Sequence, residues 1–105
     1  HFGWPWIWQT IMLALKCPRL YVDTSALYFD TAEAFVSFLF GEQIPPTVIE
    51  RSLRRQVVFG SNYPRVEIHK VASAIRSLPF HDDTFRLIFE ENALDLLERK
   101  PQGGE

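Results

Sequence analysis

The most restrictive feature of this sequence is the segment 57–64, VVFGSNYP, in which a short apolar run ends in a polar turn and a proline. Such a run is typical of a buried parallel strand, whose C-terminal end delivers a polar side chain to a site. A second run, 20–25, predicts another strand, because its residues alternate between two faces. One face would carry Leu20, Val22 and Thr24, and the other Tyr21, Asp23 and Ser25.

Helical patterns surround these two strands. One helix is predicted between Pro5 and Pro18, and because it is apolar on most sides we expect it to be buried on most sides. A second helix is predicted to begin at an Asp30 N-cap and to stop at Gly41. Three more are expected over residues 47–55, 65–78 and 82–100, the first opened by a capping box of Thr47 and Glu50.

This order of elements predicts an α/β fold. Strands that are separated by helices form a parallel sheet with right-handed crossovers. Two strands offer little surface, however, and the chain carries several apolar helices. The sequence therefore indicates that more polypeptide completes the sheet, either further chain or another copy of this one.

Composition excludes several classes of function. The chain has 105 residues, enough for one small domain, and its Lys and Arg residues form no basic stripe of the kind that binds nucleic acid. The apolar segment 4–15 is too short to cross a bilayer, and the lone Cys17 favours a reducing compartment. We therefore expect a soluble, cytoplasmic protein that binds neither nucleic acid nor membranes. The start at His1 suggests a piece of a longer protein or a trimmed product.

Three motifs, in this order, resemble the metal-dependent amidohydrolase superfamily. The segment HFGWPW at 1–6 is similar to its H-x-G-x-P-W after barrel strand six, YVDTS at 21–25 to its strand seven, and FGSNYP at 59–64 to its F-G-S-D-x-P on strand eight. Asn92-Ala93 with Leu96-Leu97 resembles the N-A-x-x-L-L element of the closing helix. The resemblance is closest to the branch with decarboxylases and lactone hydrolases. It implies that residues 1–100 form the C-terminal part, about strands seven and eight with flanking helices, of a TIM-type (β/α)8 barrel, followed by a disordered tail at 101–105.

The resemblance also implies site residues. His1 matches a histidine that lies beside the metal and polarises substrate or positions water. Asn62 stands where the family has an aspartate that binds the divalent metal; an amide oxygen ligates weakly and is no general base, and a turn-forming role is the alternative. Asp23, Ser25 and Arg65 are candidates for substrate binding, although Asp23 is also explained as a hydrogen-bonded structural carboxylate. Asn92 is interpreted as a structural clamp.

For the parent protein, the resemblance implies hydrolysis or decarboxylation of a small carboxylate-containing substrate with a divalent metal, zinc first among the candidates. The family's other ligands, a His-x-His on strand one and a histidine on strand five, have no counterpart here. We therefore expect this chain alone to bind no metal tightly. The alternative is a non-catalytic truncated fragment that self-associates through open sheet edges and apolar helices. A small-molecule or protein binding module has no positive motif behind it.

Overall fold

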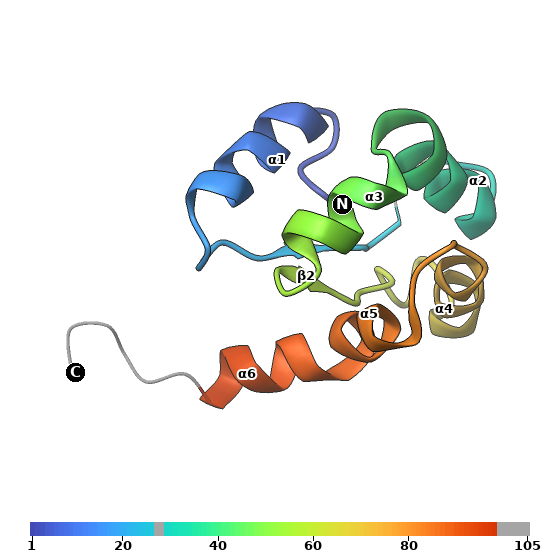
Figure 1. Cartoon of the computed structure of the whole chain (residues 1–105). Coiled ribbons are helices and arrows are strands. Elements are labelled where there is room, and N and C mark those ends of the chain that lie inside the picture. The colour runs from blue at the N-terminus through green and yellow to red at the C-terminus, as the bar shows by residue number, and fades with distance from the viewer. Residues whose placement is uncertain (27–28, 99–105) are drawn as a thin grey trace.

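The computed structural model describes residues 1–26 and 29–98 (Figure 1). The predicted tail at 101–105 lies outside the described residues. Three of the helical stretches pass from α-helix into a π-helical turn, labelled η. In chain order the elements are α1 (Ile7–Lys16), β1 (Val22–Asp23), α2 (Ala32–Ser37) with η1 (Phe38–Gln43), α3 (Pro46–Val48) with η2 (Ile49–Leu53), β2 (Val57–Val58), α4 (Ile68–Arg76), α5 (Asp82–Arg86) with η3 (Leu87–Glu91), and α6 (Asn92–Glu98).

The two predicted strands pair in parallel, as expected. Val22 lies opposite Val57 and Asp23 opposite Val58. Both strands are shorter than predicted, but the Thr24 hydroxyl prolongs their pairing: it donates to the carbonyl oxygen of Gly60 at 2.9 Å and accepts from the Gly60 amide at 3.0 Å. Val22 and Thr24 are buried and Asp23 is half-buried, so the predicted alternation of the first strand is confirmed.

The strands lie between α1 on one side and the α5–α6 segment on the other (Figure 1). An apolar core fills the space around them, and aromatic rings from distant segments meet in it. Phe40 receives Phe2 edge-on at 5.6 Å and Phe80 at 6.0 Å between ring centroids. The segments 1–2, 38–43 and 79–81 are therefore packed onto one another at the core.

The expectation that the first helix is buried on most sides is wrong. Only Ile7, Ile11 and Ala14 of α1 are buried. The larger apolar side chains stay exposed, at 46% for Trp8, 56% for Met12, 54% for Leu13 and 45% for Leu15. The reason is geometric, because a two-stranded sheet offers one face to a helix and the described chain holds no second layer outside α1.

The helix ends also differ from expectation. Thr31, one residue after the predicted Asp30, is the N-cap of α2, and its hydroxyl accepts from the Ala34 amide at 3.0 Å. The helical stretch does not stop at Gly41, which lies inside η1, and it ends at Gln43. Thr47 and Glu50 form no capping box, since the carboxylate of Glu50 is engaged elsewhere. It accepts from the His81 amide at 2.7 Å and from the Thr84 hydroxyl at 2.9 Å, at the start of α5.

None of the helices in 1–26 and 29–98 is both long enough and apolar enough to cross a bilayer.

Candidate active site at the strand ends

The C-terminal ends of β1 and β2 gather most of the polar residues singled out in the sequence. Segment 1–2 runs beside β1, because the Phe2 amide donates to the carbonyl oxygen of Asp23 at 3.0 Å. This contact brings His1 to the end of β1, while Asn62 lies in the turn that follows β2. Two side chains that are 61 positions apart in the chain therefore reach the same end of the sheet.

His1 is tied to the loop after β1 at two points. Its ring nitrogen Nδ1 lies 2.9 Å from the carbonyl oxygen of Ser25. Its terminal ammonium nitrogen lies 2.8 Å from Oδ1 of Asp23. The imidazole is half-buried and held in one orientation by these contacts.

Asn62 is tied to the next residue of the same loop. Its side-chain nitrogen Nδ2 donates to the carbonyl oxygen of Ala26 at 3.1 Å. Its backbone has φ of +76°, the left-handed region that asparagine tolerates better than most residues, and its carbonyl accepts from the Arg65 amide at 2.9 Å. The predicted turn-forming role of Asn62 is confirmed, and the side chain is oriented as well.

Asp23 is a hydrogen-bonded carboxylate at the centre of this arrangement. Its Oδ1 accepts from the Ser25 amide at 2.9 Å as well as from the terminal ammonium of His1. Partial burial raises the pKa of Asp23, but the hydrogen bonds from the terminal ammonium and from Ser25, with the charge attraction, outweigh it and hold that pKa below its ordinary value. The Asp23 carboxylate thus holds the loop after β1 in place through these hydrogen bonds. Substrate binding by Asp23 and Ser25 stays a prediction.

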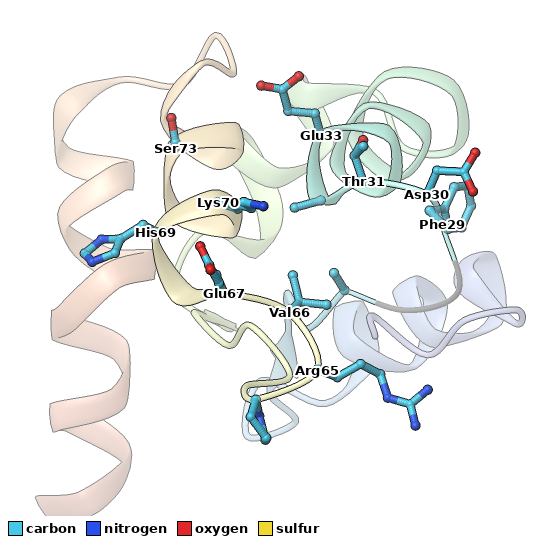
Figure 2. Close-up of a pocket in the computed structure, with 13 residues that line it drawn as sticks. Phe29, Asp30, Thr31, Glu33, Arg65, Val66, Glu67, His69, Lys70 and Ser73 are labelled. Carbon is cyan, nitrogen blue, oxygen red and sulfur yellow. The ribbon is translucent and has the colours of Figure 1, made fainter.

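Beside the strand ends lies a cleft of about 1000 Å³, between the segment that enters α2 and the segment that enters α4 (Figure 2). Its apolar wall includes Phe29 and Val66, and charged residues of both signs stand around it: Asp30, Glu33, Arg65, Glu67 and Lys70. Ala26, whose carbonyl holds Asn62, belongs to the same lining. The cleft therefore adjoins the loop after β1 through Ala26, while His1, Asp23, Ser25 and Asn62 lie outside its lining.

Two cations of the cleft are available to a ligand. Lys70 extends from α4 toward α2, whereas His69 points away from that space (Figure 2). Within residues 1–26 and 29–98, neither Lys70 nor Arg65 forms an ion pair or side-chain hydrogen bond. The sequence indicated Arg65 because it follows Pro64, but Lys70 was missed, since a lysine on an exposed helix face carries no signal of its own.

The donor set at the strand ends does not make a metal site by itself. In the part of the chain that the structure describes, no three His, Cys, Asp or Glu side chains come together to hold an ion. Asn62 presents an amide that already donates to a carbonyl, and His1 is one imidazole. A metal at this place would need ligands from outside the described residues.

A family model described as amidohydrolase matches residues 1–99. Neither a search of curated proteins nor a search of solved structures gives a significant match.

Proposed function

Since the chain belongs to the amidohydrolase family, we propose that it forms one side of the catalytic mouth of an enzyme that acts on a small carboxylate-containing substrate. Its residues would supply the C-terminal part of a TIM-type barrel, with the active site at the carboxyl ends of the strands. The reaction would be hydrolysis or decarboxylation, as in the branch that the motifs resemble.

One observation carries this proposal. The His1 ring and the Asn62 amide contact the carbonyls of two consecutive residues, Ser25 and Ala26, at the carboxyl ends of parallel strands. A histidine there is suited to move a proton near neutral pH. The substrate carboxylate would lie in the adjoining cleft, where Arg65 and Lys70 form no ion pair with any of the described residues and the wall is partly apolar.

A divalent metal, zinc first among the candidates, belongs to this proposal only for the complete enzyme. Its remaining ligands would have to come from chain other than the residues described. We keep the expectation that this chain alone holds no metal tightly.

Turnover is the test. The natural gene product that carries this chain is assayed for hydrolysis of carboxylate-bearing lactones and amides, and for CO₂ release from the matching acids. His1→Ala should lower kcat/KM by roughly 100-fold or more, the range for loss of a general acid or base. His81→Ala is the matched control, because the His81 side chain is 83% exposed and lies in the turn before α5. Equal activity of the two variants would refute the role of His1.

A non-catalytic, self-associating fragment is the second candidate, and the exposed face of α1 favours it. Trp8, Met12 and Leu15 recur at helical spacing on that exposed surface. Contiguous apolar surface of this kind usually contacts another polypeptide. The covering partner would be a second copy or the remaining barrel, and the size of the purified chain in solution distinguishes a monomer from an assembly.

A further inference from the structure

We propose that the cleft between the segments entering α2 and α4 binds a zwitterion, a small molecule that carries a carboxylate and a protonated amine on one apolar skeleton. This inference rests on the proposed function, because it names the class of substrate that the cleft selects. It adds the amine, which the proposed function leaves without a partner. The argument starts from the opposite charges of the two walls.

The wall that leads into α2 is acidic. It carries the carboxylates of Asp30 and Glu33, and among the described residues that line this wall there is no cation (Figure 2). Both carboxylates are exposed. The hydroxyl of Thr31, between them, is already engaged, because it accepts from the Ala34 amide at 3.0 Å. This wall therefore offers two negative charges to a molecule in the cleft.

The wall that leads into α4 has the opposite balance. Arg65 and Lys70 supply two positive charges and Glu67 supplies one negative charge. The Lys70 side chain extends toward α2, across the cleft, whereas His69 points away from it (Figure 2). The net charge of this wall is therefore positive, and it faces the acidic wall.

The charges of the two walls do not neutralise each other directly. Within residues 1–26 and 29–98, none of the five charged side chains of the cleft forms an ion pair or a side-chain hydrogen bond. A ligand that carries both charges satisfies both walls, with its carboxylate at Arg65 and Lys70 and its ammonium at Asp30 and Glu33. A simple anion would instead meet like charge on the α2 wall.

The lining between the charged residues is partly apolar. Phe29 and Val66 contribute side chains that are partly buried, and Ala26 and Ala32 are small and buried. An apolar skeleton that joins the two charged groups fits such a lining, and the volume of about 1000 Å³ admits a small molecule. Because Ala26 belongs to the loop after β1, the bound molecule would lie next to that loop.

Titration of the backbone amide signals of the chain by NMR tests the charge requirement. Three probes share one skeleton: L-phenylalanine carries both charges, N-acetyl-L-phenylalanine only the carboxylate, and L-phenylalaninamide only the amine, which is protonated near pH 6. L-phenylalanine should shift signals of residues 29–33 and 65–70, with a Kd lower by about fivefold or more than that of either blocked probe. Equal Kd values for the three probes, shifts confined to other segments, or no binding of L-phenylalanine would overturn the inference.

Two variants that remove single charges assign each charged group of the ligand to its wall. Lys70→Gln should raise the Kd of L-phenylalanine and of the N-acetyl probe by about threefold or more, but not that of the amide probe. Glu33→Gln should raise the Kd of L-phenylalanine and of the amide probe, but not that of the N-acetyl probe. Lys16→Gln on α1 and Glu98→Gln on α6 are the matched controls, because both side chains are exposed and lie outside the cleft. Losses that do not depend on the probe, or control variants with equal losses, would contradict the assignment.

These readouts separate this inference from the proposed function. If the cleft prefers the zwitterion with this pattern of variants, but the gene product turns over no carboxylate-bearing substrate, the proposed function fails and the binding site stands. If the gene product turns over such substrates and the cleft shows no preference for the zwitterion, only this inference fails.

Discussion

The side-chain nitrogen of Asn92 lies 2.8 Å from the carbonyl oxygen of Val57 and 2.7 Å from that of Arg54. One buried amide at the start of α6 thus holds the outer edge of β2, and the Phe59 amide reinforces the contact by donating to the carbonyl of Ile88 at 3.0 Å. The predicted role of Asn92 as a structural clamp is confirmed.

Asn92→Ala should lower the free energy of unfolding by about 1–3 kcal/mol, because two carbonyl oxygens lose their donor inside the protein. Urea unfolding measures this loss, with Gln9→Ala as the control at an exposed site of α1. A variant as stable as the control would show that the clamp contributes nothing.

Gln56 joins α1 to the sheet through a single nitrogen. Its Nε2 donates to the carbonyl oxygens of Ala14, Cys17 and Leu20, at 2.8, 3.1 and 3.0 Å. Gln56→Glu should destabilise the chain by about 3 kcal/mol or more at neutral pH, since it buries an anion against three acceptors. Gln56→Met, which removes the donor without adding charge, should cost less, and the order of the two urea midpoints checks the argument.

Two glycines should respond in opposite directions to alanine. Gly3 has φ of +74°, and a Cβ there would lie 1.8 Å from Oγ1 of Thr10, so Gly3→Ala should cost about 2 kcal/mol or more. Gly41 lies inside a helical stretch and its Cβ would meet nothing within 4 Å, so Gly41→Ala should be neutral or stabilise by up to about 1 kcal/mol. Thermal unfolding of the two variants measures both changes in stability. A loss of stability in both variants would contradict the prediction.

Asp23 should make stability depend on pH. Its pKa in the folded chain is lowered from the ordinary 3.8, so its contribution is present above that value and is lost as the pH falls through the folded pKa. The carboxyl is about half exposed, so we expect Asp23→Asn to cost about 1 kcal/mol or less at neutral pH. The difference between variant and wild type should shrink below the folded pKa; a difference that persists at acid pH would contradict the assignment.

The apolar face of α1 should drive association. Met12→Lys places a charge at its centre and should shift the sedimentation profile of the purified chain toward the monomer. Leu97→Lys is the matched control on α6, where the side chain is 82% exposed and lies on another helix. Identical profiles for wild type and Met12→Lys would remove α1 from the interface.

The sequence predicted the parallel pairing because helical segments separate the two strands. It predicted that Asn62 follows a strand because an apolar run there ends in a turn. The exposure of one face of α1 could not be predicted. Trp8 and Leu15 are residue types that usually lie in a core, and the sequence does not say whether a second layer covers them. The predicted capping box of Thr47 and Glu50 failed for a similar reason. Glu50 instead accepts a hydrogen bond from the His81 amide at the start of α5, about thirty positions away, and residue spacing cannot reveal such a partner.

At the candidate site, motifs indicated His1, Asp23, Ser25, Asn62 and Arg65, but they gave no orientation for His1 or Asn62. Orientation comes from backbone carbonyls of Ser25 and Ala26, which any residue type could supply. Lys70 lines the cleft because α4 lies beside α2, and the sequence alone does not show that arrangement. The chemistry of the site thus depends on tertiary contacts that residue identity alone does not specify.

The central claim, that parallel strands bring His1 and Asn62 to one loop, is tested most directly by nuclear Overhauser contacts in the chain itself. Cross-peaks are expected from the His1 ring to Ser25 and from the Asn62 side-chain amide protons to Ala26. Both sets, found together, would support a shared strand-end site. Contacts of either side chain with the opposite ends of the strands, near Gln56 or Leu20, would contradict it.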